Sequence, residues 1–255
     1  MRMELFTVDG LPLIKKGDDL AAMICERTEL EDHDAVVIAS TIVAKAEGAM
    51  VLKSDVVPSE RAINIAKRIG KDPALVQVVL DRSVEELVKY PLLLVENLNG
   101  HVSINAGIDD SNVEDNYFLE LPHDPDGSAK AIGERIADRC GKDVSVIITD
   151  TNGRAFKIGQ TGVAVGVYRM HPILDWRGEN DLFGNELEIT EEAVADEIAS
   201  AANLLMGEAA GGNPVVIVRG FDLHTRDDVS VKEMYRPDNE DIIRKGLRCL
   251  RQSSD

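Results

Sequence analysis

Two extended apolar stretches flank Leu98-Asn99-Gly100, and this turn restricts the fold more than any other feature of the sequence. LLLVEN comes before the turn and HVSIN follows it. Asn-Gly between two such stretches predicts a β-hairpin, because both residues accept the positive φ angles that tight hairpin turns require. A hairpin makes its two strands antiparallel, which argues against a simple doubly wound parallel sheet.

Helical and extended patterns alternate along the rest of the chain. Apolar spacing and capping residues predict helices over 20–27, 58–70, 72–83, 128–141 and, beginning at Thr190, 190–207. Continuous apolar stretches predict buried strands over 35–41, 143–150 and 214–220. Together with the hairpin, these elements indicate an α+β fold with a mixed sheet. The 255 residues contain no repeat, low-complexity segment or flexible linker, so we expect a single catalytic unit over 1–255.

The charge of the chain limits its partners. The formal net charge is −18, which argues against nucleic acid and anionic membrane surfaces as ligands, because phosphate groups are bound by clustered Lys and Arg. A phosphorylated substrate would need compensation from a few well-placed basic side chains or from divalent cations.

The sequence predicts a cytoplasmic protein with reduced thiols. No apolar stretch approaches the ~20 residues that span a bilayer, and the first residues contain acids and a proline in place of a secretory signal. Cys25, Cys140 and Cys249 lie far apart and form no CxxC pair, so neither a disulfide framework nor a zinc cluster is indicated.

Acidic residues follow extended stretches at more than one place. Asp150 follows SVIIT, Asp109 follows HVSINAGI, and Glu208 lies in the glycine-rich segment GEAAGG. Each alone is compatible with a simple turn or helix cap. Mg²⁺ and Mn²⁺, however, prefer carboxylate oxygens, often completed by water and substrate phosphates. The repeated arrangement therefore makes these three acids candidate metal ligands.

No standard nucleotide-binding loop is present. The pattern GxxxxGK[ST] does not occur, and the glycines of GQTGVAVG do not match GxGxxG. Basic residues nevertheless follow the same stretches, with Lys45 after Ser40-Thr41, and Arg154 and Lys157 after Asp150. From these residues alone, the sequence indicates a metal-dependent enzyme acting on an anionic substrate.

Several separated blocks, in order, resemble one known family. They are GLPLIKKGDDL, VVIASTIVAKAEG, NAGIDDSNV, SVIITDTNGR through GQTGVAVGV, DWRGENDLFG and AVADEIASAANLLMGEAAGGNPVVIVRG. In this order they resemble the coenzyme F420:L-glutamate ligase family, also called F420-0:gamma-glutamyl ligase, from Gly10 to Gly220. The resemblance implies a two-lobed monomer, with lobes expected at 1–85 with 190–255 and at 86–189, and an intertwined homodimer.

The resemblance also implies an activity and a set of site residues. The expected reaction is GTP-dependent addition of L-glutamate to the deazaflavin precursor F420-0, first through an amide bond and then through a gamma linkage, with two Mn²⁺ or Mg²⁺ ions and K⁺. Lys45 and Arg154 are the expected catalytic residues. The metal ligands would be Asp109 with Asp150, and Thr151 with Glu208. The GTP-binding residues would be Leu11, Pro12, Leu13, Ile14, Ser40, Thr41, Lys45, Asn112, Met206, Gly207, Glu208, Ala209, Ala210, Gly211, Gly212 and Asn213.

Two other function classes use the same residues. A two-metal phosphohydrolase would direct the acids toward activating water on a phosphate ester. A non-catalytic metal- or nucleotide-binding module would bind without turnover. A ligase releases GDP only when both acceptor and glutamate are present, whereas a hydrolase does not need the amine.

Overall fold

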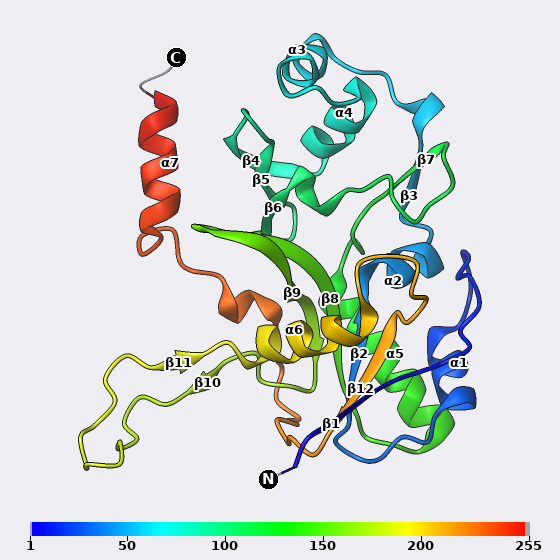
Figure 1. Ribbon diagram of the computed structural model, residues 1–255, viewed down its shortest axis with the longest axis vertical. Coiled ribbons are helices and arrows are strands. Elements are labelled where there is room, and N and C mark those ends of the chain that lie inside the picture. Colours follow the sequence, from blue (N-terminus) through cyan, green and yellow to red (C-terminus); the bar gives the residue numbers. More distant parts are fainter. Residues whose placement is uncertain (1, 253–255) are drawn as a thin grey trace.

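A mixed β-sheet forms the centre of the computed structural model, which describes residues 2–252. Its strands are β1 (Glu4–Thr7), β2 (Ala35–Ala39), β8 (Ser145–Arg154), β9 (Lys157–Tyr168) and β12 (Val215–Arg219). Their order is β1-β12-β2-β8-β9, and only the β2–β8 pair is parallel within this sheet (Figure 1). The predicted α+β class with a mixed sheet is confirmed.

Helices cover both faces of the central sheet. On one face lie α1 (Leu20–Arg27) and α5 (Pro125–Cys140), and on the other lies α6 (Val194–Met206). The side chains of β2 alternate between the two layers: Val36 and Ile38 join the α1–α5 cluster, whereas Val37 joins the α6 cluster. Burial on both faces explains why this strand is a continuous apolar stretch in the sequence.

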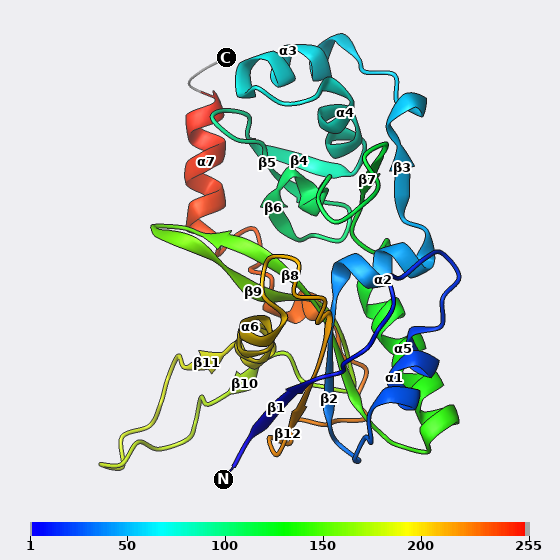
Figure 2. The same ribbon diagram turned by 45° about the vertical axis from the view of Figure 1, so that its right-hand side comes forward.

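A second, antiparallel sheet contains the predicted hairpin. Its strands are β4 (Ser83–Val88), β5 (Leu94–Asn97) and β6 (Val102–Ile104). The hairpin is confirmed, since Leu94 pairs with Ile104 and Gly100 has a φ of 87°. Helices α3 (Glu60–Ile69) and α4 (Pro73–Asp81) pack with this sheet in a separate hydrophobic cluster (Figure 2). The proposed lobe boundaries stay a prediction.

The remaining elements lie around these two sheets. They are α2 (Ser40–Glu47), β3 (Met50–Leu52), β7 (Tyr117–Leu119), β10 (Leu174–Asp175), β11 (Glu191–Glu192) and α7 (Ile242–Gln252). The β10–β11 pair belongs to a long arm that projects from the body of the protein (Figures 1 and 2). No helix within residues 2–252 combines the length and the apolar character needed to cross a membrane.

Several predicted boundaries are wrong, including the start of α5, which is Pro125 and not Ser128. The strand at 35–41 ends at Ala39, and Ser40 and Thr41 begin α2, the helix from which Ile42 and Val43 join the α1–α5 cluster. The helix expected from Thr190 begins at Val194, because Glu191 and Glu192 pair with β10. Strand β8 continues to Arg154, so Asp150 lies within the strand and not at its end.

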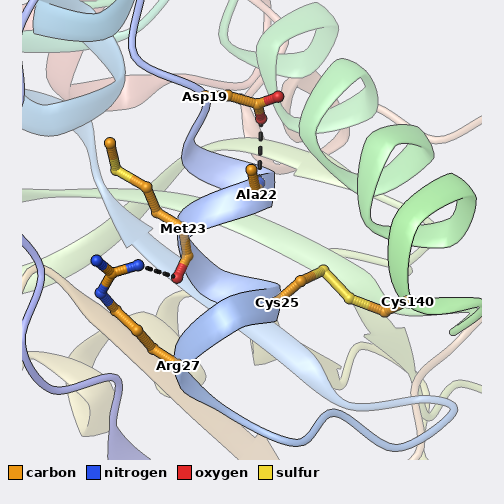
Figure 3. The surroundings of a disulfide bond; sticks show 6 residues. All are labelled: Asp19, Ala22, Met23, Cys25, Arg27 and Cys140. Carbon is orange, nitrogen blue, oxygen red and sulfur yellow. Dashed lines mark hydrogen bonds between the residues drawn. A yellow bond between two sulfur atoms is a disulfide. The ribbon is translucent and has the colours of Figure 1, made fainter.

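A disulfide bond joins Cys25 of α1 to Cys140, the last residue of α5, with 6.1 Å between the Cα atoms (Figure 3). The expectation of reduced thiols is therefore wrong for this pair. Their 115-residue separation gives no local spacing signature. The two residues meet only because both helices pack on the same face of the central sheet.

Replacing both Cys25 and Cys140 by serine should destabilise the protein. A cross-link between residues 115 apart in sequence restricts the unfolded chain strongly, and we expect a loss of about 4 kcal/mol in the free energy of unfolding. Urea unfolding with and without a thiol reductant measures this loss. Cys249→Ser, in α7, is the matched control, and an equal loss in that variant would contradict the assignment of the stabilisation to this disulfide.

His101 predicts a second, pH-dependent contribution to stability. The side chain is 9% exposed, and burial lowers its pKa to about 4. Because the unfolded chain binds this proton at a pKa near 6.5, the stabilising contribution is present above pH 6.5 and is lost as the pH falls toward 4. The loss should be about 3 kcal/mol. His101→Gln should flatten this part of the stability curve, whereas His171→Gln, at an exposed site, should leave it unchanged.

Candidate active site

A cavity of about 460 Å³ lies where five separated segments meet. The segments are the loop 11–14, the first turns of α2, the middle of β8, the loop at 109–112 and the α6–β12 loop. The first turn of α2 has no side-chain cap, because Ala39 occupies the N-cap position. Its backbone N–H groups are therefore available to an anion in the cavity.

Asp150 is the most perturbed acid of the cavity. It lies on β8 opposite Val163, and its Oδ1 accepts a hydrogen bond from Ser40 Oγ at 3.3 Å. The pKa of Asp150 is raised to about 6. Burial is the main cause, and the nearby carboxylates of Asp109 and Glu208 also raise it. A divalent cation would relieve both causes, since it compensates the desolvated charge and the repulsion.

The other two acids are held in place by neutral donors. Asp109 accepts hydrogen bonds from Asp110 N at 2.7 Å and from Ser111 Oγ. Glu208 accepts from Asn203 Nδ2 at 2.8 Å and from Thr151 Oγ1 at 3.4 Å. Within residues 2–252, none of the three acids forms an ion pair with a basic side chain.

The two predicted ligand sets each contain two oxygen-donating side chains. Among the described residues, no group of three or more His, Cys, Asp or Glu side chains is arranged to hold one ion. Asp109 with Asp150, and Thr151 with Glu208, remain the two predicted ligand sets. One or two protein oxygens per ion, completed by water and phosphate, is the usual arrangement for Mg²⁺.

Lys45 provides positive charge at the cavity wall. It lies on the second turn of α2, and its Nζ donates a hydrogen bond to the backbone oxygen of Asn112. This contact joins α2 to the loop that contains Asp109. The predicted roles of Lys45 and Asn112 are consistent with this position.

The structure brings together nearly all the residues predicted for the site. The predicted GTP-binding and metal-binding residues line the cavity, with the exception of Gly211, whose neighbours in the loop do so. Arg154 does not line it. This residue ends β8, and its Nη2 donates to the backbone oxygen of Ile158 at 3.2 Å, across the β8–β9 turn.

Sequence reasoning missed several lining residues, of which Asn203 is the most informative. Asn203 lies in the last turn of α6 and orients Glu208. Its role was not recognisable from the sequence, because a polar residue in an amphipathic helix is ordinarily expected to be exposed. Its position five residues before an acid in a glycine-rich segment is the only local signal. The other missed residues are Ala39, Ile42, Ser111, Thr149 and Pro214.

Comparison with known proteins gives a consistent result. The family model described as F420-0:Gamma-glutamyl ligase matches residues 10–220. The chain belongs to this family. A coenzyme F420:L-glutamate ligase of Methanosarcina acetivorans is 56% identical and covers 100% of both chains. Another, of Archaeoglobus fulgidus, is 52% identical over 98% of this chain and 100% of its own.

A third relative is more distant and still spans the whole fold. The coenzyme F420:L-glutamate ligase of Methanothermobacter thermautotrophicus is 46% identical over 96% of this chain. Membership in the F420-0:gamma-glutamyl ligase family makes this chain an enzyme of the ligase class. The cavity is the candidate active site of that ligase, because it gathers the acids and Lys45 from five segments.

Proposed function

We propose that this ligase adds L-glutamate to F420-0 in coenzyme F420 biosynthesis, first through an amide bond and then through a gamma linkage, with GTP as the second substrate. The observation that carries the proposal is the convergence of three carboxylates, Lys45 and the open end of α2 on one cavity large enough for a nucleotide. The description of the family names the acceptor F420-0, and the names of the relatives supply L-glutamate.

The reaction needs activation, because a carboxylate does not react with an amine at neutral pH. An oxygen of the acceptor carboxylate attacks the γ-phosphorus of GTP, GDP leaves, and an acyl phosphate forms. The glutamate nitrogen then attacks the acyl carbon, phosphate leaves with the carbon–oxygen bond electrons, and the amine loses a proton. Both steps bring anions together, so positioning and charge neutralisation dominate the catalysis.

This chain supplies those two effects with identifiable groups. Ser40 and Thr41 offer the N-terminal amides of α2 to the phosphates, and Lys45 adds a positive charge. Asp109 with Asp150, and Thr151 with Glu208, would hold two Mn²⁺ or Mg²⁺ ions. When bound, these ions would neutralise the phosphate oxygens and the leaving group. We propose that the reaction also requires K⁺.

Mass spectrometry of the product tests the proposal. Incubation with F420-0, GTP, Mn²⁺, K⁺ and L-glutamate should give discrete mass increases of one glutamyl residue each, with one GDP released per addition. GDP should appear only when F420-0 and glutamate are both present. GDP release without glutamate, and no mass increase, would favour the phosphohydrolase and contradict the ligase.

We also propose that the enzyme is a homodimer formed through its projecting segments. Phe156 and Ile158 at the β8–β9 turn are 95% and 100% exposed, and Leu182 and Phe183 on the β10–β11 arm are 101% and 91% exposed. Large apolar side chains on projecting segments are typical of surfaces covered by another subunit.

Charged substitutions at the β8–β9 turn test this assembly. The double variant Phe156→Asp/Ile158→Asp should shift the mass measured by light scattering from dimer to monomer, because a charge cannot be buried unpaired at the interface. Val57→Asp, at another exposed apolar site, is the matched control. A monomeric wild-type protein, or a dimeric double variant, would contradict the proposed interface.

A further inference from the structure

A smaller cavity of about 160 Å³ is separate from the candidate active-site cavity, which is called the nucleotide cavity below. It is bounded by the end of α4, the β5–β6 turn and the segment after β7. Five polar residues line it, namely Arg82, Asn97, Asn99, Glu120 and His123. We call it the Arg82 cavity.

Asn97 is the most informative of these groups, because it is buried with an unused donor. The residue is 5% exposed. Its Oδ1 accepts hydrogen bonds from Asn99 N at 2.9 Å and from His101 N at 3.1 Å, which closes the hairpin turn. No described residue accepts a hydrogen bond from its Nδ2, and this nitrogen is not sealed from solvent. Because Asn97 lines the Arg82 cavity, the unused donor is available to a molecule within it.

The charged groups of the cavity also leave donors unused. Arg82 donates to Glu120 through Nε at 2.6 Å and through Nη2 at 3.1 Å, and His123 Nε2 lies 2.9 Å from Glu120 Oε2. Both carboxylate oxygens of Glu120 are thus occupied. The Nη1 atom of Arg82 has no hydrogen-bond partner among the described residues. The unused donors are therefore Nη1 of Arg82, whose charge is paired with Glu120, and Nδ2 of Asn97, and two such N–H groups can bind a carboxylate.

Part of the lining of the Arg82 cavity is apolar and buried. Ala106, Ile108 and Leu121 form it, and all three are buried. An aliphatic chain carrying a carboxylate would satisfy both surfaces. The volume is about a third of the 460 Å³ of the nucleotide cavity, so the occupant is smaller than a nucleotide.

The Arg82 cavity is connected to the candidate active site through one isolated antiparallel β-bridge. Asp109 exchanges backbone hydrogen bonds with Leu119, at 3.0 Å and 2.8 Å. The Arg82 cavity is lined by Ile108, which precedes Asp109, and by Glu120, which follows Leu119. A ligand bound there would fix the position of the segment that presents Asp109.

We propose that the Arg82 cavity binds the carboxylate of a small aliphatic amino acid, and that this amino acid is L-glutamate. The choice of glutamate rests on the proposed function, whereas the carboxylate site rests on the unused donors of Asn97 and Arg82. Glutamate bound there would contact Ile108, the residue before the predicted metal ligand Asp109.

Calorimetric titration of the full-length protein with L-glutamate tests the site independently of turnover. The dimethyl ester of L-glutamate, which lacks both carboxylates, is the matched probe and should not bind. Asn97→Asp keeps the oxygen that closes the turn and replaces the donor by a repelling carboxylate. It should weaken glutamate binding at least tenfold and raise the KM for glutamate equally, with little change in the KM for GTP. Asn116→Asp makes the same change at an exposed position outside the cavity and should bind normally.

A second variant protects the test against misfolding. Arg82→Gln/Glu120→Gln removes both charges together and leaves no unpaired buried charge, and it too should weaken glutamate binding at least tenfold. Wild-type protein that binds no glutamate, or both variants binding within twofold of wild type, would overturn the inference. Product analysis tests the proposed function separately. Glutamylated product with an unchanged KM for glutamate in both variants would support the ligase activity and contradict glutamate binding in the Arg82 cavity.

Discussion

Replacing Asp150 by asparagine should lower the ligation rate about a thousandfold, a loss of about 4 kcal/mol, while stabilising the metal-free protein. Asparagine keeps an oxygen that can accept the hydrogen bond from Ser40. It removes the negative charge that the proposed ion between Asp109 and Asp150 would require. Burial and the two neighbouring carboxylates already disfavour that charge, which raises the pKa of Asp150 to about 6.

The sign of the stability change follows from that raised pKa. A carboxyl group whose folded pKa exceeds its unfolded value of about 3.9 destabilises the native state above pH 6, and this penalty disappears as the pH falls toward 4. The amide of the Asp150→Asn variant carries no charge and so escapes this penalty. In the presence of a chelator at pH 7.5, the variant should therefore gain about 2 kcal/mol in the free energy of unfolding, allowing for the partial exposure of the site.

Two measurements made on the same preparation decide this prediction. Product formation by mass spectrometry gives the rate, and chemical unfolding with a chelator gives the stability. Asp110→Asn removes a neighbouring acid that does not line the cavity and is the matched control. An Asp150→Asn enzyme with near wild-type activity would exclude a metal-binding role for Asp150, and a variant that lost stability would show that the carboxylate is structural.

Lys45→Met should raise the KM for GTP about a hundredfold, because Lys45 is the basic side chain that the structure places on the cavity wall. The loss corresponds to about 3 kcal/mol, within the range for removing a charged partner from a partly desolvated phosphate. Lys45→Arg should recover part of the affinity. Initial rates at varied GTP concentration measure the effect, and an unchanged KM in Lys45→Met would contradict phosphate binding by this residue.

Arg154 provides an informative comparison in the same assay. Its guanidinium donates to the backbone oxygen of Ile158, and the residue does not line the candidate active-site cavity. Arg154→Met should therefore leave the KM for GTP within about threefold of wild type. A fall in kcat with that KM unchanged would support the predicted catalytic role at a step that does not involve nucleotide binding.

Local sequence pattern was sufficient to predict structure where contacts within a short segment determine its conformation. The Asn99-Gly100 hairpin, the Asp19 cap of α1 and the Asp72 cap of α4 depend on contacts within a few residues. The metal-ligand hypothesis also arose from local pattern, namely the similar settings of Asp109 and Asp150 after extended stretches and the glycine-rich segment around Glu208, and it stays a prediction. The assignment to GTP and to particular positions came from the resemblance of six blocks and not from residue spacing.

The sequence by itself determined the α+β class and the hairpin, because these follow from side-chain chemistry and neighbouring residues, whereas the cation-binding role of the acids stays a prediction. Only the tertiary structure decided that Ser40 begins a helix, that Cys25 meets Cys140, and that Arg154 lies away from the cavity. The same holds for the Arg82 cavity, where Arg82, Asn97 and Glu120 meet from three elements. Contacts between distant segments depend on how helices and sheets pack, and a one-dimensional pattern does not encode that packing directly.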